Sequence, residues 1–229
     1  MRRFGPLTRV LSGHDDRQLI IWLVKSPHEV ILVSTLVHHT DILWGLDIST
    51  QFVVSCSEDK SVAVYLHSDI FPKISSNTNL SINNMENLLV PGQLSSRLVG
   101  HTAAVTFVSV ESDLVVSGSR DRTVRVWQLD TTGYTLIRVL VGHTELVHYV
   151  AQDQDRIYSS DDNGVLLVWD KRKVVDRRDH GDGGDDDGDY LVKRFDYGER
   201  GAIDCIKIMG TKVYTSYDDF GNIAINDFW

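Results

Sequence analysis

Histidine, serine and aspartate occur in this chain at a spacing that could serve hydrolytic chemistry. His101, Ser117 and Asp121 supply an imidazole base, a hydroxyl nucleophile and an acid that could orient the imidazole. The set recurs in phase 42 residues later and 62 residues earlier, as His143, Ser159 and Asn163 and as His39, Ser55 and Asp59. A catalytic site is needed only once, so the recurrence favours a structural hydrogen-bond network over a triad.

An aromatic residue completes each copy of the set. It stands ten residues after the serine, in an alternating apolar run, as Trp127, Trp169 and Tyr65. An imidazole buried in a sheet needs hydrogen-bond partners, because leaving one of them unpaired costs about 1–3 kcal/mol. We therefore predict one buried network of these four residues within each of these three copies.

The residues between these positions predict short strands. The copy that begins at Gly100-His101-Thr102 has apolar and β-branched runs at 105–110, 114–117, 124–129 and 136–141, separated by polar turns. The next copy begins at Gly142-His143-Thr144. The period predicts an all-β fold made of repeating units of four antiparallel strands.

The period near forty residues, the opening Gly-His pair and the closing Trp resemble the WD40 repeat family. The resemblance implies a β-propeller in which each repeat forms one blade. Residues 1–229 then form one domain of about five blade-like units, near 7–37, 38–99, 100–141, 142–197 and 198–229. The first unit has no candidate for its first strand and the last unit none for its fourth, so we expect a partial propeller cut from a longer ring.

Two insertions interrupt the repeats. Residues 68–97 are polar and are expected to form a surface loop. Residues 176–189 hold seven Asp and two Arg, which predicts an acidic loop. A calcium-binding EF-hand loop does not fit, because placing Gly188 at its sixth position puts Gly183 at the first and Arg194 at the twelfth.

Composition narrows the possible functions. The net charge of −9 argues against nucleic acid as a partner. The longest apolar run, Leu19 to Val24, is too short to span a membrane, and no apolar segment of a secretory signal follows Met1. Cys56 and Cys205 have no second ligand at metal-binding spacing, so we expect no metal or cofactor and a cytoplasmic or nuclear location.

Connections at one end of a propeller's blades form a surface that we call the top face. Aligning the units places on it Asp41, Glu58, Arg120, Glu145, Asp161, Tyr217 and Asp218. Because acids dominate this set, we expect a basic or mixed-charge peptide or protein as the partner. The leading hypothesis is a noncatalytic protein–protein interaction scaffold.

Two alternatives are kept open. Leu98 to Val105 and Val116 to Asp121 also resemble blades of F-box/WD-repeat substrate receptors of ubiquitin ligases, which implies ubiquitin-ligase components as partners and top-face arginines that bind phosphorylated segments. Arg120 is the one arginine at such a position in this sequence. The other alternative is an enzyme that uses the central channel, for which the sequence offers no phosphate loop and no metal cluster.

Overall fold

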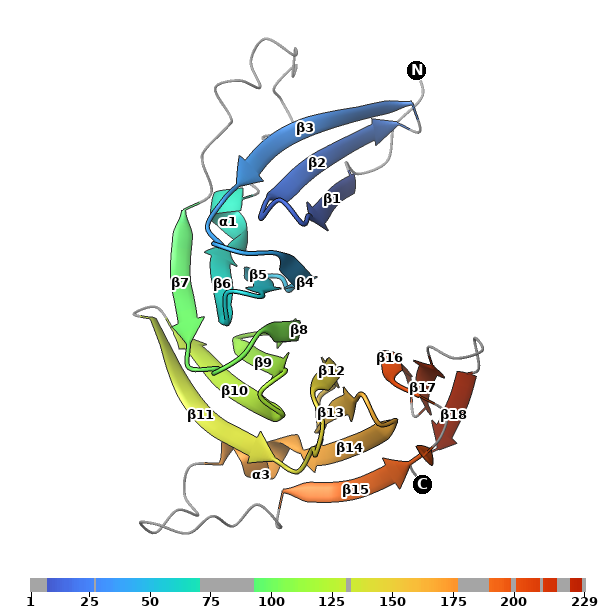
Figure 1. Ribbon diagram of the computed structural model, residues 1–229. Coiled ribbons are helices and arrows are strands. Elements are labelled where there is room, and N and C mark those ends of the chain that lie inside the picture. The colour runs from blue at the N-terminus through green and yellow to red at the C-terminus, as the bar shows by residue number, and fades with distance from the viewer. Residues whose placement is uncertain are drawn as a thin grey trace.

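The computed structural model of the 229-residue chain describes residues 8–26, 28–70, 93–130, 133–176, 190–198, 201–210, 212–217 and 223–227. These residues form five antiparallel sheets that follow one another along the sequence. Figure 1 shows the sheets side by side along an open arc, with the two end sheets at its ends. The predicted all-β fold, a partial propeller of four-stranded units, is confirmed.

The first and last sheets have three described strands each. The first comprises β1 (Thr8–Gly13), β2 (Leu19–Ser26) and β3 (Glu29–Leu36). The last comprises β16 (Ile203–Met209), β17 (Lys212–Tyr217) and β18 (Ile223–Asp227).

The three central sheets have four strands each. The second holds β4 (Leu43–Ile48), β5 (Phe52–Ser57), β6 (Ser61–Leu66) and β7 (Leu94–Val99). The third holds β8 (Val105–Glu111), β9 (Leu114–Ser119), β10 (Thr123–Asp130) and β11 (Gly133–Val141). The fourth holds β12 (Val147–Gln152), β13 (Arg156–Asp161), β14 (Val165–Asp170) and β15 (Leu191–Asp196). Figure 1 shows β4, β8, β12 and β16 on the inner side of the arc and β3, β7, β11 and β15 on its outer rim.

Two short helices follow third strands of the central sheets. The first, α1 (His67–Ile70), and strand β7 take up the two ends of the predicted insertion 68–97, whose middle lies outside the described residues. The other, α3 (Lys171–Val175), is capped by Asp170, which accepts hydrogen bonds from the backbone of Arg172 and Lys173. Apart from Asp176, the predicted acidic insertion 176–189 lies outside the described residues. Within the described ranges no helix has the length and hydropathy that crossing a membrane requires.

The core lies between the sheets. Strands β5 and β9 are buried along their whole length, because each sheet is covered on both faces by its neighbours. In the third sheet Val115 and Trp127 pack toward the second sheet, while Val116 and Val126 pack toward the fourth. This two-sided burial explains why β5 and β9 show no alternation of buried and exposed residues.

Candidate protein-binding face

The third sheet contains the predicted network in full. His101 Nδ1 lies 2.8 Å from Asp121 Oδ2, and its Nε2 lies 2.8 Å from Ser117 Oγ. The indole Nε1 of Trp127 donates to the same serine oxygen over 2.9 Å. The imidazole side chain is 1% exposed, so water does not replace any of these partners.

The protonation state of this network follows from its charges. Burial alone would raise the pKa of the Asp121 carboxyl, but hydrogen bonds from His101 and Thr123 outweigh it and hold that pKa well below its usual range. Burial also lowers the pKa of His101, and the neighbouring Asp121 offsets only part of this effect. At neutral pH the aspartate is therefore ionised and the imidazole neutral, so Nδ1 carries the proton and Nε2 accepts from the Ser117 hydroxyl.

The second sheet repeats this arrangement with a tyrosine. His39 lies 2.9 Å from Asp59 and 3.0 Å from Ser55, and Tyr65 replaces the tryptophan as the aromatic partner of the serine. Hydrogen bonds from His39 and Ser61 outweigh the opposing effect of burial and lower the pKa of Asp59.

The fourth sheet departs from the prediction for Asn163. His143 binds Ser159 over 2.7 Å, and Trp169 donates to that serine over 2.9 Å. However, its acidic partner is Asp161, at 2.9 Å, and not the turn residue Asn163. The other oxygen of Asp161 accepts the backbone N–H of Asn163 and of Val165, so one carboxylate at the end of β13 both braces the turn and orients the imidazole.

The first sheet has a related network from an unexpected position. Trp22 Nε1 donates to Ser12 Oγ over 2.8 Å, as Trp127 does to Ser117. The imidazole comes from His14, whose Nε2 lies 2.9 Å from the same oxygen. Two residues after the serine, a histidine supplies the ring that the second, third and fourth sheets take from the connection before their first strand.

The networks position a row of turns at one end of the sheets. In the third sheet Asp121 accepts the backbone N–H of Thr102, which ties the β9–β10 turn to the connection that precedes β8. Ser119 Oγ donates to the Ala103 carbonyl in the same connection, and Ser57 Oγ donates to the Asp41 carbonyl in the second sheet. These bonds hold the predicted top face in place.

A bulge lies near the start of each inner strand. The pairing shifts between Leu43 and Gly45, Val105 and Phe107, Val147 and Tyr149, and Ile203 and Cys205. Each shift leaves one residue unpaired, and these four residues are Trp44, Thr106, His148 and Asp204. A bulge of this kind redirects a side chain. Trp44 and His148 reach Glu58 and Asp162 in the turn between the second and third strands of their sheets, whereas Thr106 donates to the carbonyls of Gly118 and Val147.

The first cluster on the top face joins the second and third sheets. Trp44 is 46% exposed, and its Nε1 donates to Glu58 Oε2 over 2.6 Å. Arg120 donates to the other oxygen of Glu58 over 3.1 Å, and its guanidinium carbon lies 5.0 Å from the centre of the indole ring. The glutamate therefore holds an exposed aromatic ring and a guanidinium in fixed positions.

The second cluster joins the fourth and fifth sheets. His148 Nε2 lies 3.0 Å from Asp162 Oδ1, and its Nδ1 lies 3.8 Å from Asp204 Oδ1. All three side chains are between 35% and 49% exposed. Within the described ranges, no group of three or more His, Cys, Asp or Glu side chains is placed to hold a metal ion.

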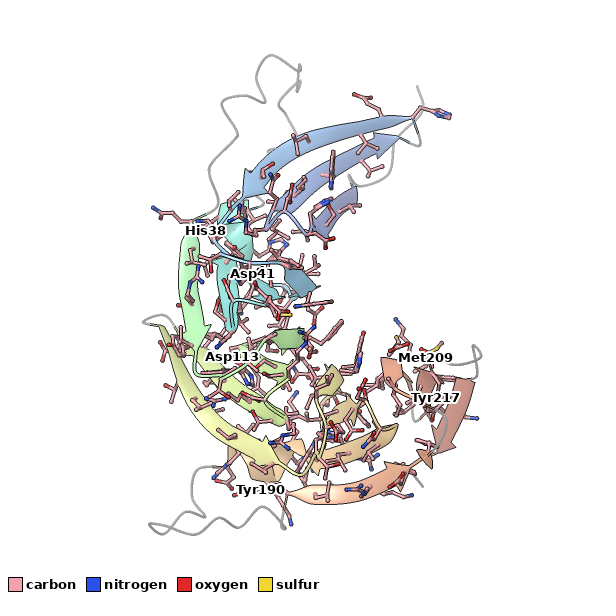
Figure 2. All side chains as sticks on the ribbon, in the orientation of Figure 1. His38, Asp41, Asp113, Tyr190, Met209 and Tyr217 are labelled. Atoms are coloured by element: carbon pink, nitrogen blue, oxygen red, sulfur yellow. The ribbon has the colours of Figure 1, made fainter. Side chains whose placement is uncertain are left out.

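The predicted top-face residues differ in how far they are exposed to solvent. Asp41, Glu145 and Arg120 are exposed, and Glu58 is half-buried. Asp161 is 0% exposed and Tyr217 is 4% exposed, so neither offers the open surface that was predicted for it. Figure 2 shows Asp41 in the connection that leads into β4 and Tyr217 within the last sheet. Asp218 lies outside the described residues.

Sequence reasoning missed the bulged side chains. A tryptophan in an inner strand would ordinarily be expected in the core, but almost half of Trp44 is exposed. The signal was present in the repeat offsets: Trp44, Thr106, His148 and Asp204 stand 62, 42 and 56 residues apart, as do the opening residues of their units.

Comparison with known proteins gives one family. The family model described as "WD domain, G-beta repeat" matches residues 31–65, 92–128 and 134–170. The chain is 25% identical over 135 residues to "Mitochondrial division protein 1" of Schizosaccharomyces pombe, covering 55% of this chain and 19% of that protein. It is 34% identical over 99 residues to "WD repeat-containing protein pop2" of the same organism, covering 43% of this chain and 13% of that protein. It is also 30% identical over 127 residues to "Telomerase protein component 1" of Rattus norvegicus, covering 54% of this chain and 4% of that protein. The chain thus spans less than a fifth of the length of each of these relatives.

Solved structures agree on the fold. The computationally designed protein Ika8 superposes with a TM-score of 0.68 at 21% identity, over 96% of this chain and 57% of that one. The designed protein Ika4 superposes with a TM-score of 0.61 at 20% identity, over 85% of this chain and 96% of that one. WD40 repeats are generally noncatalytic and serve protein–protein interaction. The matched repeats, the recurring networks and the five sheets together show that this chain belongs to the WD40 repeat family.

Proposed function

We propose that this chain is a noncatalytic scaffold whose top face binds a basic or mixed-charge segment of a partner protein. The observation that carries the proposal is the cluster of Trp44, Glu58 and Arg120. Tryptophan and arginine are enriched at the centres of protein interfaces, and an aromatic side chain held in one position loses little entropy on binding. The indole of Trp44 is held in this way by Glu58 while almost half of the residue remains open to a partner.

The charge of the top face supports a basic partner. At the described turn and bulge positions the exposed or half-buried acids Asp15, Asp16, Asp41, Glu58, Glu145, Asp162 and Asp204 outnumber the cations Arg17, Lys60, Arg120 and Arg122. Glu58 already neutralises Arg120. The excess of acids gives these turns a net negative charge, which favours the approach of lysine and arginine side chains.

The same pairing argues against a phosphorylated ligand. A ubiquitin-ligase substrate receptor of the kind that the sequence resembles would need several unpaired cations to bind a phosphate. Arg120 is engaged by Glu58 on one side and lies over Trp44 on the other. We therefore prefer the basic or mixed-charge segment to the phosphorylated one.

A peptide-binding survey tests the proposal. The full chain is titrated with arginine- and lysine-rich dodecapeptides, with their aspartate- and glutamate-rich counterparts and with phosphoserine-containing versions. We expect saturable binding of the basic set, weakened about tenfold or more by Trp44→Ala. Val141→Ala, which shortens a side chain that is 48% exposed on β11, serves as the control. Preferential binding of phosphopeptides, or equal effects of the two substitutions, would contradict the proposal.

A further inference from the structure

The guanidinium of Arg120 lies against the second sheet rather than against its own. Arg120 belongs to the turn between β9 and β10 of the third sheet. Its Nη1 donates to Glu58 Oε1 over 3.1 Å, and its guanidinium carbon lies 5.0 Å from the centre of the Trp44 ring. Both of these partners come from the second sheet, so the side chain of Arg120 bridges two sheets on the top face.

The position of Arg120 carries an acid in two other sheets. Glu58 stands there in the second sheet and Asp162 in the fourth, at the same offsets of 62 and 42 residues as the network histidines. Each of these acids binds the bulged side chain of its own sheet, namely Trp44 over 2.6 Å and His148 over 3.0 Å. The third member of the fourth-sheet cluster is another acid, so a bulged ring stays bound to its turn acid without a guanidinium beside it.

The third sheet gives Arg120 no equivalent partner. Its bulged residue is Thr106, whose hydroxyl donates to the backbone carbonyls of Gly118 and Val147. Among the described residues the guanidinium forms its one ion pair with Glu58, and the two side chains are 40% and 31% exposed. An ion pair of this exposure adds little to stability, so it opens at little cost.

We propose that Trp44 and Glu58 form a binding site for an arginine side chain, that Arg120 is its resident occupant, and that an arginine of the partner protein displaces it. The proposal rests on the proposed function, because it concerns the same surface. The resident contacts show what the site recognises: a planar cation that lies over the face of an indole while it donates to a carboxylate. Lysine has no flat group to lay on the ring, so arginine is the preferred ligand.

The site stays formed when Arg120 leaves it. The indole Nε1 of Trp44 donates to Glu58 Oε2, the oxygen that Arg120 does not use. The backbone N–H of Glu58 donates to the Ile42 carbonyl over 2.9 Å, which fixes the turn that carries the carboxylate. The resident guanidinium therefore competes with the ligand and does not build the site, so its removal should raise the affinity.

Removal of Arg120 tests this competition. The full chain and its Arg120→Ala variant are titrated into a fluorescein-labelled, arginine-rich dodecapeptide while the anisotropy of the peptide is followed. Because the apparent affinity is reduced in proportion to the fraction of sites that are open, Arg120→Ala should tighten binding by about three- to tenfold. A variant that failed to fold would lose affinity, so a gain cannot come from unfolding. Unchanged or weaker binding by Arg120→Ala would overturn the proposal.

Two further variants separate displacement from a change of net charge. Arg122 is exposed in the same turn and forms no ion pair within the described part of the chain, so Arg122→Ala removes the same charge without opening the site and should change the affinity by less than about twofold. Equal gains from Arg120→Ala and Arg122→Ala would overturn the proposal. Glu58→Gln keeps an acceptor for the indole but removes the carboxylate, so it should weaken binding about tenfold and abolish the gain from Arg120→Ala in the double variant. A gain that persists in the double variant would show that Arg120 does not act through Glu58 and would also overturn the proposal.

A lysine-rich dodecapeptide of the same length and charge distinguishes this proposal from the proposed function. It should bind less tightly than the arginine-rich peptide, and equal binding would overturn the assignment to arginine while leaving a basic partner in place. Binding that Trp44→Ala weakens but Arg120→Ala does not tighten would likewise overturn only the resident arginine. No saturable binding of either peptide, by the unmodified chain or by Arg120→Ala, would contradict both proposals.

Discussion

Ser117 joins two buried groups that have no other means of satisfying their hydrogen bonds. Its hydroxyl donates to His101 Nε2 over 2.8 Å and accepts from Trp127 Nε1 over 2.9 Å. The serine is 0% exposed and the tryptophan 1% exposed. Ser117→Ala removes one oxygen and leaves the imidazole nitrogen and the indole N–H unpaired, away from water.

The cost of this substitution can be worked from these contacts. Each buried polar group left unpaired costs about 1–3 kcal/mol, so Ser117→Ala should lower the free energy of unfolding by about 2–5 kcal/mol. For a chain of this size the melting temperature would fall by roughly 4–20 °C. Ser12→Ala is the matched control, since Ser12 makes the same two kinds of bond to His14 and Trp22. Those three residues are only half-buried, so water can replace the hydroxyl and the loss should stay below about 1 kcal/mol.

Urea denaturation followed by far-ultraviolet circular dichroism measures both losses under the same conditions. Equal losses for Ser12→Ala and Ser117→Ala would refute the reasoning, because burial would then not determine the cost. A loss below about 0.5 kcal/mol for Ser117→Ala would show that the network adds little to the stability of the third sheet.

Three further predictions concern the same networks and the two cysteines. Acid should destabilise the chain in two stages, because the folded state lowers the pKa of both His101 and Asp121. Below about pH 6.5 the unfolded state binds a proton at His101 that the folded state does not bind, and below about pH 4 it does so at Asp121. Urea midpoints measured against pH should show both stages, and Asp121→Asn should flatten the lower one; stability that rises on acidification would contradict the assignment. Asp161→Ser should destabilise the fourth sheet by about 2–4 kcal/mol. Adding Asn163→Asp should restore most of this loss, because the double variant recreates the arrangement of Ser119 and Asp121 in the third sheet. No recovery in the double variant would show that the turn cannot supply the acid. Burial raises the pKa of the Cys56 thiol, while Cys205 is exposed, so a thiol reagent should modify one cysteine in the native chain and both in urea; modification of both in the native chain would contradict the burial of Cys56.

The sequence contains enough to predict the sheets and most of the networks. His101, Ser117 and Trp127 recur at constant offsets because a buried polar cluster tolerates few changes of position. The top face is harder to predict from sequence, because its side chains are not required by the packing that the repeats share. Trp44 illustrates the difficulty: an aromatic residue in a strand is usually buried, and only the bulge at this position turns it outward.

The position two residues after the network serine shows how this fold varies without losing its networks. Ser57 and Ser119 occupy it in the second and third sheets and brace the connection before the inner strand. In the fourth sheet Asp161 occupies it and replaces the turn acid, and in the first sheet His14 occupies it and supplies the imidazole. The backbone at the end of this strand brings a side chain within reach of both the ring site and the turn, so one substitution there can replace either partner. Alignment by residue type misses such exchanges, since it expects each role at a fixed place, whereas the physical requirement is only that every buried donor and acceptor finds a partner.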